Sequence, residues 1–192
     1  MNEQNNLFPI FLKLETLSLL IVGGGEVAIE KLSAVLNNSP QTKIKLVAKE
    51  IREEIRAMVV GHPKITLLQK EFEPSDIDGM DLVIAAVNDR SLSTVITKST
   101  HAKGKLINAA DKPDLCDFYL GSIVQKGNLK IAISTNGQSP TAAKRIKEML
   151  NEALPAELDE MITNLNLVRQ KLQGDFKEKV IKLNEITKGL LD

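Results

Sequence analysis

The stretch "LLIVGGGEVAIEK" (residues 19–31) decides the fold of this 192-residue chain. The apolar run 17–22 ends at three consecutive glycines, and apolar residues then recur at helical spacing from Ile29 to Leu36. A continuous apolar run of this length is typical of a strand that is buried on both faces of a parallel sheet. The stretch therefore predicts a strand, a tight turn and a helix, in that order.

The glycines and the small residue after them form a G-x-G-x-x-A pattern, Gly23, Gly25 and Ala28. In such a pattern the first glycine permits the tight turn, the second lets the backbone approach a diphosphate, and the small third residue lets the helix pack closely on the sheet. The N–H groups and the positive dipole end of the helix then favour the diphosphate. A purely structural turn is the alternative, and on the dinucleotide hypothesis the Glu26 side chain points away from the cofactor. The predicted cofactor residues of this turn are Gly23, Gly24, Gly25, Glu26, Val27 and Ala28.

The alternation of strand and helix patterns continues to residue 110. It predicts a Rossmann-type, doubly wound parallel sheet with right-handed crossovers, an α/β fold. The further predicted strands are 43–48, 65–69, 81–87 and 105–110, and the predicted helices between them include 50–60 and 89–102, the latter capped by Asp89.

The alternation of strand and helix patterns ends after Asp111. Residues 117–135 contain two strand-like runs around "KGN" and predict a β-hairpin. Ser139 and Pro140 then suit the N-cap and the first position of a helix that runs to Leu154. Two amphipathic helices on either side of Gly174 complete the chain, so a small hairpin and helix region and a C-terminal helical region follow the sheet.

Composition excludes several functions. Lys and Arg together number 25, as do Asp and Glu, so the net charge of zero gives no field for nucleic acid, and 3% aromatic residues leave few stacking platforms. Cys116 is the only cysteine and there are two histidines, so we expect neither an intrachain disulfide nor a metal site. Because neither a signal-peptide pattern nor an apolar run of roughly 20 residues is present, we expect a cytoplasmic protein that does not bind membranes.

The ends of the second and fourth strands supply further cofactor candidates. Glu50 is placed to bind the ribose hydroxyls, although it also suits a solvated helix start, and Lys49 would tolerate a 2′-phosphate. On these residues we favour NAD over NADP. Val87 and Asn88 follow the fourth strand and are expected to line the adenosine or nicotinamide side of the crevice.

Asp111 falls at the carboxyl end of the fifth strand, where ligands bind in open α/β sheets. A carboxylate there can take a proton from a substrate bound against the cofactor, and we expect partial burial to suit it to that role. The alternative is that Asp111, which precedes Lys112 and Pro113, only shapes a turn.

Four stretches resemble the precorrin-2 dehydrogenase family, the dehydrogenase and ferrochelatase portion at the N-terminus of siroheme synthase. They are "FPIFLKLETLSLLIVGGGEVAIEK", "DLVIAAVND", "INAADKPDLCDFY" and "LKIAISTNGQSPTAAKRIKE", and the resemblance covers residues 7 to about 155. It implies oxidation of precorrin-2 to sirohydrochlorin with NAD as hydride acceptor, with ferrous iron insertion to give siroheme in some members.

The resemblance also implies residue roles and an organisation. The family's catalytic aspartate falls on Asp111, and its dinucleotide contacts fall on Glu26, Val27, Lys49 and Glu50. Its members form homodimers, here through about 113–145. The implied division is a dinucleotide-binding domain (1–112), a dimerisation region (113–145) and a helical region (146–192).

A tetrapyrrole that bears many carboxylates needs cationic groups and N–H donors at the rim of its site. The alternative for the basic residues is a solvated helix face. Two different functions also remain open: a dinucleotide-sensing regulatory module, and an enzyme that only inserts the metal. The candidate substrate residues are Asn136, Gly137, Ser139, Thr141, Lys144 and Arg145.

Overall fold

The computed structural model describes residues 4–173 and 175–188. The chain divides into two compact units at Leu120 and Gly121, with Gln4 and Asn5 grouped with the second unit. Each unit is described by itself below. The division predicted at residues 112 and 145 stays a prediction, and Gly174, where two helices were expected to join, lies outside the described residues.

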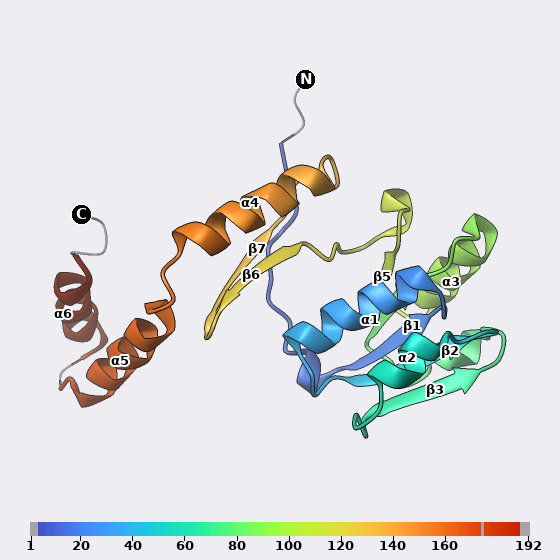
Figure 1. Ribbon diagram of the computed structural model, residues 1–192, viewed down its shortest axis with the longest axis horizontal. Helices are drawn as coiled ribbons and strands as arrows, with labels where there is room; N and C mark the ends of the chain where they lie inside the picture. The colour runs from blue at the N-terminus through green and yellow to red at the C-terminus, as the bar shows by residue number, and fades with distance from the viewer. Residues whose placement is uncertain (1–3, 174, 189–192) are drawn as a thin grey trace. The chain divides into compact units, whose positions relative to one another are not determined.

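The first unit is a five-stranded parallel sheet with the strand order β3-β2-β1-β4-β5, which confirms the predicted doubly wound fold (Figure 1). The chain runs outward from β1 to β3 and then returns to the other side of β1, so the order reverses between β1 and β4. In open α/β sheets the crevice at this reversal binds ligands. The elements are β1 (Ser18–Val22), α1 (Glu26–Asn38), β2 (Lys43–Ala48), α2 (Glu53–Met58), β3 (Ile65–Gln69), β4 (Leu82–Ala85), α3 (Arg90–Ala102) and β5 (Leu106–Ala109).

Helices on both faces of the sheet explain why the central strands are apolar throughout. On β1, Leu19 and Ile21 pack in the cluster that contains α1 and α2, whereas Leu20 and Val22 pack in the cluster that contains α3. All four side chains are at most 2% exposed. Since both faces are buried, the strand does not alternate apolar and polar residues.

The helix predicted over 50–60 is shorter, because α2 begins only at Glu53. The residues before it form a loop that packs on the glycine turn, and the Arg52 N–H donates to the Gly24 carbonyl oxygen at 3.1 Å. A short 3-10 segment at Pro74–Ile77, which we did not predict, precedes β4 and contains the buried Asp76. The segment has only four residues, which is too few for a repeat of apolar residues to reveal it in the sequence.

The second unit contains the predicted hairpin, formed by β6 (Ser122–Lys126) and β7 (Leu129–Ile133), and three helices, α4 (Pro140–Ala153), α5 (Leu158–Lys171) and α6 (Phe176–Thr187). Helix α4 begins as predicted: Pro140 is its first residue, and the Ser139 hydroxyl accepts a hydrogen bond from the Ala142 N–H at 3.1 Å.

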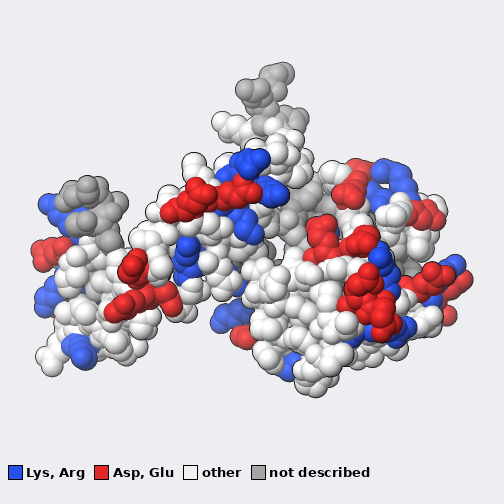
Figure 2. Space-filling view, viewed as in Figure 1, with Lys and Arg blue, Asp and Glu red and all other residues white. Residues whose placement is uncertain are grey.

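Within the described residues, the structure contains no helix long and apolar enough to cross a membrane. On the face shown in Figure 2, acidic and basic side chains intermingle over both units, and no extended patch of one sign stands out among the residues described. Positive and negative charges are therefore balanced within each part of this face, and not only in the sequence as a whole.

Candidate dinucleotide-binding site

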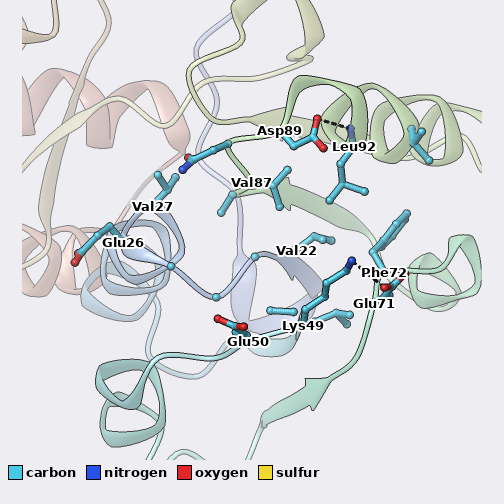
Figure 3. Close-up of a pocket in the computed structure, with 18 of the residues that line it drawn as sticks. Val22, Glu26, Val27, Lys49, Glu50, Glu71, Phe72, Val87, Asp89 and Leu92 are labelled. Atoms are coloured by element: carbon cyan, nitrogen blue, oxygen red, sulfur yellow. Dashed lines mark hydrogen bonds and ion pairs between the residues drawn. The ribbon is translucent and has the colours of Figure 1, made fainter.

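A cavity of about 700 Å³ opens at the carboxyl ends of β1, β2 and β4, at the reversal of the strand order (Figure 3). Its volume is in the range of small-molecule and cofactor sites. The structure thus brings together, from three separate strand ends, nine of the residues predicted to contact the cofactor: Gly23, Gly24, Gly25, Glu26, Val27, Lys49, Glu50, Val87 and Asn88.

Glycine is needed at the three positions of the turn for different physical reasons. Gly23 has a φ of 128°, and a β-carbon there would overlap the carbonyl oxygen of Ala86. A β-carbon on Gly24 would overlap the carbonyl oxygen of Glu50, whereas one on Gly25 would meet open space. Gly23 and Gly24 therefore serve the fold, and Gly25 is the glycine whose open side is available for the close approach of a ligand.

The start of α1 presents backbone donors to this space. Gly25 is the N-cap of α1 and contributes no side-chain hydrogen bond to it, so the first N–H groups of the helix are left for a ligand or water. Ala28, which was predicted as a cofactor residue, does not line the cavity. Its side chain is fully buried against the sheet, because the small third residue of the pattern serves the close packing of helix and sheet.

The Glu26 side chain extends away from the cavity, as expected (Figure 3). Its carboxylate forms an ion pair with Arg52, and Arg52 also pairs with Glu54 at 3.0 Å. The Arg52 guanidinium neutralises the acid nearest to the helix start. A diphosphate bound at the first N–H groups of α1 would consequently lie near a Glu26 carboxylate whose charge is already balanced by Arg52.

Lys49 and Glu71 form an ion pair of 2.8 Å at the ends of β2 and β3 (Figure 3). The hydrogen bond and the charge of Glu71 raise the pKa of Lys49, and Lys49 in turn lowers the pKa of Glu71. With Glu50 beside them, this end of the cavity carries two acids and one base. A second phosphate group would have to compete with Glu71 for the lysine.

One wall of the cavity is apolar and was not predicted from the sequence. Phe72 comes from the loop after β3 and Leu92 from the start of α3, and both side chains point into the cavity (Figure 3). Val95 adds an apolar side chain that is 50% exposed. The wall matches the flat apolar face of an adenine ring. Residues at the end of β3 could have been found, because β3 is also a parallel strand whose carboxyl end meets the same edge.

Asp89 also lines the cavity and was predicted only as a helix cap. Its carboxylate accepts hydrogen bonds from the Ser91 hydroxyl at 2.6 Å and from the N–H groups of Ser91 and Leu92. These bonds, with the charge of Lys112, lower the pKa of Asp89. The prediction of the cap is confirmed.

Asp111 lies two residues beyond β5 in a left-handed conformation with a φ of 58°. Aspartate tolerates this region better than most residues, and such positions cluster at functional sites. The side chain is exposed, so the expected partial burial was wrong: the turn carries Asp111 outward between the buried residues Ala110 and Lys112. Asp111 is not among the residues that line the cavity.

The candidate substrate residues lie in the second unit, outside this cavity. Asn136 and Gly137 have φ values of 54° and 74° and form the left-handed turn before α4, where the Ser139 N–H donates to the Thr135 hydroxyl at 3.2 Å. Thr141, Lys144 and Arg145 are exposed on α4, and Arg145 pairs with Glu148 at 2.7 Å. In the described part of the chain, no group of three His, Cys, Asp or Glu side chains could hold a metal ion.

Comparisons with known proteins agree with this geometry. The family described as putative NAD(P)-binding matches residues 10–122, and the family described as sirohaem biosynthesis protein, central, matches residues 126–153. The siroheme synthase of Methylococcus capsulatus is 34% identical over 173 residues, 90% of this chain and 34% of that protein. Siroheme synthase 1 of Cronobacter sakazakii is 35% identical over 153 residues, 80% of this chain and 32% of that protein.

The chain thus spans about a third of the length of the curated relatives it matches. A solved structure of comparable length is also similar: SirC, a precorrin-2 dehydrogenase, has a TM-score of 0.76 and 25% identity, over 94% of this chain and 89% of that one. The similarity therefore extends through both units and is not limited to the sheet.

Proposed function

Since the chain belongs to the precorrin-2 dehydrogenase family, the NAD(P)-binding family that also forms part of siroheme synthases, we propose that it oxidises precorrin-2 to sirohydrochlorin in siroheme biosynthesis. The observation that carries the proposal is the cavity at the strand-order reversal, with the open side of Gly25 facing it, in a chain with the fold of a precorrin-2 dehydrogenase.

The residues of the cavity fit a nicotinamide dinucleotide. The first N–H groups of α1 bind the diphosphate, Glu50 binds the ribose, and Phe72 and Leu92 flank the adenine. We propose NAD as the specific cofactor, because the Lys49 ammonium is already neutralised by Glu71 at 2.8 Å and two acids would repel the additional phosphate of NADP.

The chemistry divides between the cofactor and the chain. The bound cofactor supplies the hydride acceptor. Asp111 removes the matching proton from the macrocycle, so that two hydrogens leave the substrate as a hydride and a proton without a charged intermediate accumulating. Exposure of Asp111 in the single chain suits this role, because the acid has to reach a large substrate that lies outside the cofactor cavity.

The family resemblance extends the proposal to the second unit. The turn and helix start at Asn136, Gly137, Ser139 and Thr141, with Lys144 and Arg145, bind the carboxylates of the tetrapyrrole. We further propose a homodimer through about 113–145; Leu120 is 41% exposed, and Ile146 just beyond the region is 39% exposed. Ferrous iron is proposed as a second substrate, with the macrocycle itself providing the metal ligands.

Anaerobic absorbance spectroscopy tests the proposal. The chain is incubated with precorrin-2 alone, with NAD, with NADP, and with NAD and ferrous iron. The spectrum of sirohydrochlorin should form with NAD and faster than with NADP, and iron should convert it further to siroheme. If the spectrum does not change with either dinucleotide although calorimetry detects their binding, the chain is a dinucleotide-sensing module. In a fifth incubation, with ferrous iron and no dinucleotide, a change of the spectrum would indicate an enzyme that only inserts metal.

A further inference from the structure

Lys112 is the basic residue that this fold buries. It is 8% exposed, whereas no other Lys or Arg within the described ranges 4–173 and 175–188 is buried. It follows Asp111 directly, in the turn after β5. Its Nζ has no carboxylate within ion-pair distance among the residues that the structure describes, so its charge is balanced only by dipoles and by acids farther away.

The Lys112 ammonium joins the ends of two neighbouring strands. Its Nζ donates to the carbonyl oxygen of Val87 at 2.9 Å and to that of Ala110 at 3.2 Å. Val87 lies just beyond β4 and lines the cofactor cavity, and Ala110 is the residue before Asp111. The last paired residues of these strands are Ala85 and Ala109, so the lysine continues the connection where the backbone ladder ends.

Two backbone hydrogen bonds hold the segment around Asp111: the first joins it to the end of β4 and the second closes the turn. The Ala110 N–H donates to the Ala85 carbonyl oxygen at 3.0 Å, and the Lys112 N–H donates to the Ala109 carbonyl oxygen at 3.2 Å. Asp111 itself has the left-handed φ of 58°, which persists only where neighbouring contacts fix it. The lysine side chain supplies one of those contacts, on the carbonyl immediately before Asp111.

The choice of a charged side chain here needs a reason. Burying an ammonium costs free energy that two neutral carbonyls repay only in part, and an apolar side chain could fill the same space at lower cost. The compensating benefit is a fixed link between the cofactor wall and the turn that carries the acid. Catalysis is sensitive to such links, because small errors in the placement of reacting groups slow the reaction strongly.

We propose that Lys112 is a positioning residue that ties the Val87 segment of the cofactor cavity to the Asp111 turn, so that the acid keeps its place relative to the bound dinucleotide. This inference rests on the proposed function. Lys112 contacts neither the substrate nor the cofactor in this role; it acts through Val87 and Asp111.

Steady-state kinetics of Lys112→Met in the full chain test the proposal. Methionine matches the length of lysine but donates no hydrogen bond. We expect kcat to fall about 10- to 100-fold, while KM for NAD and the calorimetric affinity for NAD change by less than about threefold. Lys98→Met, at an exposed lysine on α3, is the matched control and should retain the kcat of the wild-type chain.

A double-mutant cycle separates positioning from a general loss of structure. If Lys112 acts through Asp111, Lys112→Met should slow single turnover by less than about threefold when Asp111 is already asparagine, because coupled residues are not additive. An equal loss in both backgrounds would overturn the proposal, as would an unchanged kcat or a loss of NAD affinity equal to the loss of kcat.

Two further outcomes have distinct meanings. If Lys112→Met does not fold, Lys112→Gln is tested by the same criteria, and failure of both to fold overturns the proposal, because the lysine is then only structural. Absence of NAD-dependent turnover in the wild-type chain would instead contradict the proposed function, and this result is seen before any variant is made.

Discussion

Gly24 and Glu50 meet through their backbones, and no room remains for a β-carbon on Gly24 against the Glu50 carbonyl oxygen. The contact joins the glycine turn after β1 to the loop after β2, and the hydrogen bond from the Arg52 N–H to the Gly24 carbonyl oxygen, at 3.1 Å, reinforces it. The middle glycine of "GGG" is thus required by packing. Its neighbour Gly25 faces the cavity, where a β-carbon would meet open space.

Alanine substitutions at these two glycines should therefore affect different properties, stability at Gly24 and cofactor binding at Gly25. Gly24→Ala forces the two loops apart and should lower the free energy of unfolding by about 1–3 kcal/mol. Gly25→Ala should leave the unfolding free energy nearly unchanged but weaken NAD binding by about tenfold or more, because the methyl group occupies the space of the diphosphate. Urea unfolding and calorimetry measure the two quantities. Equal unfolding curves for both variants would show that the Gly24 contact is not required.

Asp111→Asn should separate binding from chemistry. The amide keeps the size of the side chain and its tolerance of the left-handed conformation at φ 58°, but it cannot accept the substrate proton. We expect NAD affinity within about twofold of the wild-type value and a loss of precorrin-2 oxidation of at least about 100-fold. Calorimetry and anaerobic absorbance check the two parts. Full turnover by this variant would remove Asp111 from the mechanism.

Glu71→Gln should weaken the preference for NAD. The substitution removes the charge that neutralises Lys49 at 2.8 Å, so the ammonium becomes available to a 2′-phosphate. We expect the ratio of NADP to NAD affinity to rise by about threefold or more. Because Lys49 lowers the pKa of Glu71, the acid is ionised at neutral pH and the wild-type preference should hold there.

The control for this prediction is Glu73→Gln. Glu73 pairs with Lys70 at 2.8 Å, and neither residue lines the cavity. Calorimetric titration of both dinucleotides into each variant gives the ratio. The prediction is wrong if the two variants change the ratio equally, since the effect would then reflect the net charge and not the ion pair in the cavity.

Cys116 should react slowly with thiol reagents. Burial raises the pKa of its thiol, and the sulfur contacts the Ala109 N–H at 3.2 Å and the Ala109 carbonyl oxygen at 3.1 Å. At neutral pH the thiol is therefore protonated, and the reactive thiolate should increase only as the pH rises toward the raised pKa. At pH 7.5, Ellman's reagent should react with Cys116 of the native chain at least about tenfold more slowly than it reacts with the thiol of glutathione. With the urea-unfolded chain it should react about as fast as with glutathione. Modification of the native chain as fast as glutathione would contradict this.

The sheet and the cofactor turn could be predicted because local patterns specify them. The apolar strands, the glycines and the caps at Ser139 and Asp89 each depend on neighbours within a few residues, and the structure places them as expected. The strand-order reversal also follows from the alternation of strands and helices, which leaves few topologies. Family resemblance then assigned a chemistry to Asp111, a role that its position alone left open.

The sequence by itself thus determined the parallel sheet, the glycine turn and the family to which the chain belongs. Only the tertiary structure revealed why Gly24 must be glycine, that Glu71 neutralises Lys49, that Phe72 shares the cavity, and that Lys112 is buried between the ends of β4 and β5. Each of these facts depends on how the loops that follow different strands lie relative to one another. Their distances depend on how the sheet orders its strands and how far each loop extends, and no local periodicity records that information.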